Sequence, residues 1–182
     1  MQVDELEIVG SYLMTLPKYQ DDRGSFENHF PQKELDFLPK AFIVKQVNLS
    51  RNNRKGTLRG LHYQAEPYAE GKIVSCIYGE VFDVLVDLRR NSSSFGRWQS
   101  IQLSETQNFI YVPPGVAHGF QTLDENCTLQ YLHSGEYSAS HSSGVRFDDP
   151  ELNISWPLEV ASISRADQQL PNLAEMRKKH AM

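Results

Sequence analysis

The chain has 182 residues, a net charge of −5 and a hydrophobic content of 40%. This length suits one domain with a sizeable core, and we expect a single domain over residues 1–182. The acidic balance argues against a nucleic-acid-binding protein, which is usually basic. We see no signal peptide, and no apolar run approaches the roughly 18 residues of a membrane span, so we expect a cytoplasmic protein with no membrane partner.

Short apolar runs separated by Gly, Pro, Asn and Asp recur along the chain and are typical of strands. Helical patterns are confined to residues 32–38 and 172–179, the second of which follows a proline. The runs that predict strands cover residues 42–50, 73–77, 81–88, 100–103, 109–112 and 127–133. This spacing favours an all-β sandwich or barrel.

The expected strand at residues 42–50 carries an unusual polar face. Strict alternation places Gln46, Asn48 and Ser50 on one side. Such a face borders either bulk solvent or a wet cavity, and the pattern alone leaves both open. The two cysteines, Cys76 and Cys127, lie in apolar runs and predict buried free thiols.

Residues 56–64, GTLRGLHYQ, concentrate polar side chains in a strand-like run, and Lys72 follows shortly afterwards. A lone histidine in a strand is more often structural than catalytic. Alternation places Arg59 and His62 on opposite faces, and only a bulge at Gly60 would bring them to the same side.

Residues 111–120, YVPPGVAHGF, contain a Pro-x-Gly-x-x-His pattern that resembles the second motif of cupins, a family of β-barrels. Metal-binding cupins carry His-x-His in their first motif, where this chain has His62-Tyr63-Gln64. An amide is a poor ligand for the usual cupin metals, so we predict a metal-free barrel without a cofactor.

Several motifs in the same order resemble the dTDP-4-dehydrorhamnose 3,5-epimerase family and its 3- and 5-epimerase relatives. They are DDRG (21–24), LRGLHYQ (58–64), GK (71–72), VFDVLVDLR (81–89), FGRW (95–98), PGVAHGF (114–120) and FDDP (147–150). The resemblance implies a cupin-type double-stranded β-helix, or jelly-roll barrel, with a few short helices. It also implies a homodimer that epimerises C3, C5 or both in a nucleotide-linked 4-keto-6-deoxyhexose, in deoxysugar and O-antigen precursor biosynthesis.

The resemblance also implies roles for individual residues. His62 would be the base, Asp167 would hold it, Tyr131 would be the acid on the opposite face of the sugar, and Lys72 would stabilise the enolate. On its own, Tyr131 alternates with apolar neighbours, which favours a core residue. The substrate-binding positions implied are Arg23, Phe26, Asn28, Gln46, Asn48, Arg59, His118 and Tyr137, with the two arginines on the diphosphate.

Three positions depart from the family pattern. Asn28 and Ser142 stand where the family commonly has Glu, and Ala166 stands where Lys often precedes the Asp. An amide can pair with the base edge of cytosine, whereas a carboxylate suits thymine, so Asn28 suggests a CDP-linked rather than a dTDP-linked substrate. Three other functions remain open: a sugar 3,4-ketoisomerase, a non-catalytic sugar-binding cupin and a metal-dependent cupin.

Overall fold

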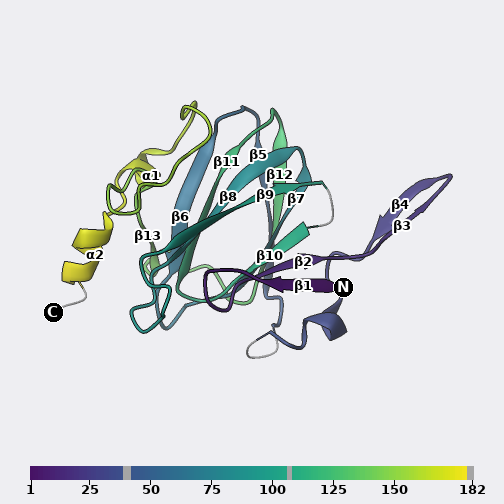
Figure 1. Cartoon of the computed structure of the whole chain (residues 1–182), viewed down its shortest axis with the longest axis horizontal. Coiled ribbons are helices and arrows are strands. Elements are labelled where there is room, and N and C mark those ends of the chain that lie inside the picture. The colour runs from purple at the N-terminus through teal and green to yellow at the C-terminus, as the bar shows by residue number, and fades with distance from the viewer. Residues whose placement is uncertain (39–41, 106–107, 180–182) are drawn as a thin grey trace.

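The computed structural model describes residues 1–38, 42–105 and 108–179, and two antiparallel sheets make up most of it (Figure 1). In spatial order, one sheet contains β1 (Gln2–Glu5), β2 (Tyr12–Thr15), β10 (Asn108–Val112), β7 (Lys72–Tyr78), β12 (Cys127–His133) and β5 (Gln46–Asn52). The other contains β13 (Ser142–Gly144), β6 (Leu58–Gln64), β11 (Val116–Thr122), β8 (Glu80–Asp87) and β9 (Trp98–Ser104). The predicted all-β jelly-roll barrel is confirmed.

The main core fills the space between the two sheets. Val74 and Leu129 of the first sheet pack in one cluster with Leu85 and Phe120 of the second, and each is at most 1% exposed. Cys76 and Cys127 lie in the same cluster as free, buried thiols, as the sequence predicted. Because alternate residues of a strand point to opposite faces, the two inner faces supply this core together.

The outer face of the six-stranded sheet is covered by a short 3-10 helix, η1 (Gln32–Leu35), in the region where one or two turns were predicted. Leu35 packs there with Phe42, whose ring contacts Tyr111 edge-on at 5.9 Å between centroids. This burial explains why β5 begins at Gln46 and not at Phe42, as the sequence had suggested. The side chain of Phe42 is needed on the outer face, so its segment leaves the sheet.

The C-terminal segment covers the outer face of the five-stranded sheet. Helix α2 (Leu173–Lys179) begins within the predicted range, and its Leu173 and Met176 pack against this face. Helix α1 (Arg165–Gln168) was not predicted; the hydroxyl of Ser164 caps it by accepting from the Asp167 amide at 3.0 Å. In the part of the chain that the structure describes, no helix has the length and hydropathy needed to cross a membrane.

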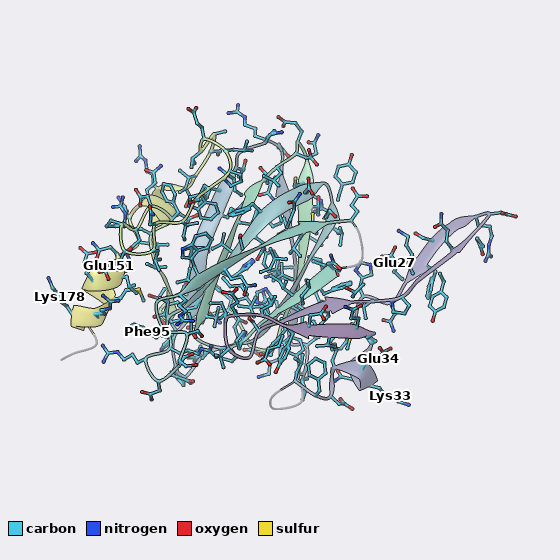
Figure 2. The ribbon with its side chains drawn as sticks, in the orientation of Figure 1. Glu27, Lys33, Glu34, Phe95, Glu151 and Lys178 are labelled. Atoms are coloured by element: carbon cyan, nitrogen blue, oxygen red, sulfur yellow. The ribbon has the colours of Figure 1, made fainter. Side chains whose placement is uncertain are left out.

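A hairpin of β3 (Lys18–Asp21) and β4 (Gly24–Glu27) projects from the barrel on the side opposite α2 (Figure 1). Glu27 lies where the hairpin joins the barrel (Figure 2), and its carboxylate is 2.9 Å from Nζ of Lys18. Two aromatic side chains on this hairpin are unusually open, with Tyr19 65% and Phe26 74% exposed. The hairpin therefore lacks the packing that holds the other strands.

The strand β6 contains an irregularity at Gly60. His118 of β11 is paired with His62, but Phe120, two residues later, is paired with Arg59, three residues earlier. One extra residue on β6 is the signature of a β-bulge. Gly60 has a φ of +124°, and a Cβ there would come within 2.6 Å of the Gly119 backbone, so only glycine fits. The structure therefore contains the bulge at Gly60 that would bring Arg59 and His62 to the same side.

Candidate active site

A cavity of about 700 Å³ opens between the two sheets at one end of the barrel. It is lined from both sheets and from the segment around α1. Most of the residues singled out from the sequence line it together: Asn48, Arg59, His62, Lys72, His118, Tyr131, Tyr137 and Asp167. Asn48 and Asp167 are 119 positions apart in the sequence, so only the folded barrel brings this set together.

His62 and Asp167 form a hydrogen-bonded pair on one wall, with His62 Nε2 2.8 Å from Asp167 Oδ1. The amide of Gly60 donates to the other carboxylate oxygen at 3.3 Å. Burial works to raise the pKa of Asp167, but the hydrogen bonds from His62 and Gly60 outweigh it, and this pKa lies below its ordinary value. An ionised carboxylate only accepts, so Nε2 of the neutral ring carries the proton and Nδ1 keeps a free lone pair.

Tyr131 projects from β12 on the opposite sheet into the same cavity. Burial raises the pKa of Tyr131 well above its ordinary value; nearby Asp83 adds to this effect, and Arg59 opposes it. The phenol is therefore protonated at neutral pH and can donate a proton. Its neighbours Leu129 and Cys127 face the core, so the alternation noted in the sequence is confirmed and Tyr131 lies where the core meets the cavity.

His118 and Asp83 form a second pair deeper in the barrel. Nε2 of His118 lies 2.7 Å from Oδ2 of Asp83, and the two residues are 4% and 0% exposed. Burial raises the pKa of Asp83, and His118 opposes this. The His118 ring meets Tyr131 edge-on at 5.7 Å between centroids. His118 thus borders the cavity but has little freedom to move within it.

Lys72 and His133 share one carboxylate. Oε1 of Glu70 is 3.9 Å from Nζ of Lys72 and 3.2 Å from Nδ1 of His133. Burial lowers the pKa of Lys72, while Glu70 opposes this and favours the charged ammonium. The His133 ring also stacks on Tyr131, with 5.8 Å between centroids and 20° between planes.

Arg59 reaches the cavity because of the bulge at Gly60. Its Nε donates to Oδ1 of Asn52 at 2.7 Å, which orients the guanidinium and leaves its two terminal nitrogens for an anion. Asn48 also lines the cavity, which answers the question raised by the polar face of β5. Gln46 does not itself line the cavity but donates to Oδ1 of Asn48 at 3.0 Å.

Besides Gln46, three residues implied by the resemblance do not line this cavity. Arg23 and Phe26 lie on the projecting hairpin, where Arg23 pairs with Asp21 at 2.5 Å. Asn28 follows the hairpin, and its Oδ1 accepts from the Phe30 amide at 3.1 Å. Within one copy of the chain these side chains belong to another part of the molecule.

Four residues that contact the predicted site residues were not singled out from the sequence: Glu70, His133, Asp83 and Asn52. A usable signal existed for two of them. His133 shares the face of Tyr131 by alternation, and Asp83 is a carboxylate inside an apolar strand. The departures Ser142 and Ala166 both line the cavity, so the change from the family pattern falls in the site itself.

Gln64 occupies the position where metal cupins have a ligand. Here its amide nitrogen donates to the backbone carbonyls of Tyr68 and Glu136, and its oxygen accepts from the Ser138 amide at 2.6 Å. In the ranges that the structure describes, no group of three or more His, Cys, Asp or Glu side chains could hold a metal ion. Independence from metals remains a prediction.

A jelly-roll barrel with these residues at its open end defines an enzyme of the cupin class. The family model for dTDP-4-dehydrorhamnose 3,5-epimerase matches residues 5–175. The dTDP-4-dehydrorhamnose 3,5-epimerase of Sinorhizobium fredii is 38% identical over 97% of this chain and 91% of its own length. The chain belongs to the dTDP-4-dehydrorhamnose 3,5-epimerase family.

Solved structures agree with this assignment. The RmlC epimerase of Mycobacterium tuberculosis superimposes with a TM-score of 0.94 at 36% identity, over 100% of this chain and 93% of its own. NovW, a 4-keto-6-deoxy sugar epimerase from Streptomyces spheroides, gives 0.94 at 34% identity, over 100% and 92% of the two chains.

Proposed function

We propose that this protein is an isomerase that epimerises C3, C5 or both in a nucleotide-diphosphate-linked 4-keto-6-deoxyhexose. One observation carries the proposal: His62 of one sheet, paired with Asp167 of α1, and Tyr131 of the other sheet line a single cavity. Two related structures support the substrate class. The Legionella pneumophila enzyme is solved with dTDP-4-keto-L-rhamnose, and the 3'-monoepimerase ChmJ of Streptomyces bikiniensis with dTDP-quinovose, at 34% and 30% identity.

In the proposed mechanism, His62 Nδ1 removes a proton from the carbon beside the C4 ketone. Asp167 stabilises the imidazolium that forms and keeps the ring in one orientation. The electron pair left by that proton moves onto the C4 oxygen as an enolate, and the Lys72 ammonium stabilises its charge. Tyr131 then donates a proton to the carbon from the opposite face, and this inverts the centre. Solvent afterwards restores the protonation states of His62 and Tyr131.

The diphosphate would lie against Arg59, whose Nε is held by Asn52 and whose terminal nitrogens have no hydrogen bond within the described residues. Arg23 and Phe26 are proposed to bind the same substrate from a second copy of the chain in a homodimer. Their hairpin projects away from its own barrel (Figure 1), and its aromatic side chains are exposed. The edge strand β5 adds exposed Val47 and Leu49, which a partner could cover.

Proton NMR in heavy water tests the proposed function, with dTDP- and CDP-linked 4-keto-6-deoxyglucose offered separately. Deuterium should enter at C3, C5 or both while the ketone stays at C4. Migration of the ketone to C3 would indicate a ketoisomerase. Binding without any exchange would indicate a sugar-binding protein, and loss of exchange on chelation, restored by a divalent ion, would indicate a metal-dependent enzyme.

A further inference from the structure

A line of polar contacts connects a buried carboxylate to two amides at the edge of the cavity: the first is an ion-pair contact, and the next two are hydrogen bonds. Oε1 of Glu70 lies 3.2 Å from Nδ1 of His133, and the other ring nitrogen, Nε2, lies 3.3 Å from Nδ2 of Asn48. Oδ1 of Asn48 in turn accepts from Nε2 of Gln46 at 3.0 Å. The four side chains come from the start of β7, from β12 and from β5, which lie side by side in the six-stranded sheet.

With an ionised Glu70 and a neutral His133 ring, the chemistry of the groups permits one direction for these contacts. The Glu70 carboxylate only accepts, so Nδ1 of His133 carries the proton. In the neutral ring Nε2 is then an acceptor, and Asn48 must offer its NH₂ to it. The Asn48 carbonyl consequently faces Gln46, which must donate. A carboxylate at one end thus determines which atoms of two amides are donors and which are acceptors.

Glu70 is well suited to be the fixed end of this line. It is 8% exposed, and the next residue, Gly71, is bound twice to Ser134, which follows β12. The Gly71 amide donates to Oγ of Ser134 at 2.8 Å, and the Ser134 amide donates to the Gly71 carbonyl at 3.0 Å. A Cβ at Gly135 would come within 2.8 Å of the Glu70 Cβ, so the backbone there closes over the side chain. Glu70 therefore has little room to turn.

We infer that Glu70 and His133 are positioning residues that hold Asn48 and Gln46 in one donor–acceptor pattern toward the substrate. The inference rests on the proposed function and on the family resemblance, which implies that Asn48, in the cavity wall, and Gln46, bonded to it, are substrate-binding positions. An unrestrained amide can rotate by half a turn and exchange its NH₂ and its carbonyl. Restraint removes the wrongly oriented form, which would leave polar groups of the substrate unpaired.

The substitution His133→Phe tests this directly, because phenylalanine keeps a ring to stack on Tyr131 and lacks both nitrogens. With dTDP-4-keto-6-deoxyglucose we expect KM to rise about tenfold and kcat to fall by much less, since ordering of the amides favours binding and the proposed base His62 and acid Tyr131 are both retained. His141→Phe is the matched control: His141 bonds Ser138 and Ser140 outside the cavity, and KM should not change. An unchanged KM in His133→Phe, with wild-type enzyme active, would overturn the inference and leave the proposed function intact.

A double-substitution cycle separates positioning from a direct contact. If His133 acts through Asn48, adding His133→Phe to Asn48→Ala should change KM by no more than about twofold beyond Asn48→Ala alone. Independent contributions would instead multiply, and that result would refute the inference.

Nitrogen-15 NMR of histidine-labelled protein gives a readout that needs no catalysis. The signal lost in His133→Phe identifies His133, and its shifts should show a protonated Nδ1 and an unprotonated Nε2. Glu70→Leu removes the acceptor that selects this tautomer, so the pattern should change in that variant. A protonated Nε2 in the wild-type protein would contradict the inference, as would a pattern unaffected by Glu70→Leu.

Discussion

His62 and Asp167 lie 105 positions apart in the sequence, and their side chains meet at 2.8 Å. The bulge at Gly60 positions His62, because it turns this side chain toward the cavity, and the Gly60 amide also donates to Asp167. The N-cap of α1 positions Asp167, because the Ser164 hydroxyl accepts from the Asp167 amide and fixes this turn. The proposed base therefore depends on two local irregularities in an otherwise regular barrel.

The first prediction concerns this pair. His62→Asn should abolish deuterium exchange at the sugar ring, because the asparagine amide cannot act as a base. Asp167→Asn should lower kcat by about a hundredfold or more while KM changes little, because an amide can stabilise the wrong tautomer and no longer balances the imidazolium. Exchange rates by NMR and steady-state kinetics measure both. Wild-type exchange in His62→Asn would show that the assignment of the base is wrong.

The second prediction concerns Tyr131. Tyr131→Phe removes only the hydroxyl and keeps the ring contacts with His118 and His133. Proton removal by His62 should continue, so deuterium should still enter the substrate, while formation of the inverted product should fall much further. The ratio of exchange to product, followed by NMR over time, checks this. An equal loss of both would assign Tyr131 a positioning role.

Regular features of this protein could be predicted from the sequence because they follow from alternation. The strands of the core and the inward face of Tyr131 follow from the two-residue period. The same period placed Gln46 and Asn48 on one polar face, but it did not decide between solvent and the cavity that Asn48 lines. The sequence showed that only a bulge at Gly60 would bring Arg59 and His62 to the same side. It could not show that the bulge forms, because the bulge depends on the backbone of Gly119 across the sheet. The partner of His133, Glu70, could not be found, because pairing across strands depends on register, which no local pattern specifies.

The third prediction tests whether the hairpin acts between two copies of the chain. A His62→Asn chain has no base but an intact hairpin, and a chain with Arg23→Ala and Phe26→Ala has an intact cavity but a defective hairpin. Each should be nearly inactive alone. If hairpins cross, mixed dimers contain one complete site, and co-refolding the two should restore about half of the wild-type activity in each mixed dimer. No recovery, or an active monomer by light scattering, would argue against the proposed dimer.

The fourth prediction concerns stability in acid. Asp87 is fully buried and accepts from Arg89 at 2.7 and 2.8 Å and from the hydroxyls of Ser92 and Ser94 at 2.5 Å. Burial works to raise the pKa of Asp87, but these hydrogen bonds outweigh it and lower this pKa. Since the folded state holds its proton less tightly than the unfolded state, the stabilisation is complete above the ordinary value near pH 3.9 and is lost as pH falls through the folded pKa.

Asp87→Asn should therefore lower the free energy of unfolding at pH 7 by about 3 kcal/mol and flatten its dependence on pH below pH 4. Urea denaturation at a series of pH values measures both. Asp148→Asn is the matched control, because Asp148 also pairs with an arginine, Arg146, but at the surface, where the effect should be much smaller. Equal effects of the two substitutions would contradict the role given to burial.

The last prediction concerns the nucleotide. Thymine presents an N–H between two carbonyls, whereas cytosine presents a ring nitrogen acceptor beside an amino group. Asn28 stands where the family commonly has Glu, and within the part of the chain that the structure describes no hydrogen bond engages its NH₂, which can donate to the cytosine ring nitrogen. Its Oδ1 already accepts from the Phe30 amide, and the second lone pair of that oxygen can accept from the cytosine amino group. A CDP-linked sugar should therefore bind about tenfold more tightly than its dTDP counterpart, a difference of about 1.4 kcal/mol.

Calorimetry with CDP and dTDP gives the two dissociation constants for the wild-type protein and for Asn28→Glu. The substitution restores a carboxylate, which accepts from the thymine N–H and cannot donate to cytosine, so the ratio should move toward dTDP. Glu27→Gln is the control, because Glu27 pairs with Lys18 and should not contact the base, so the ratio should not change. If dTDP binds the wild-type protein at least as tightly as CDP, and Asn28→Glu leaves the ratio unchanged, then Asn28 does not select the nucleotide and the dTDP-linked substrates named for the relatives are the better assignment.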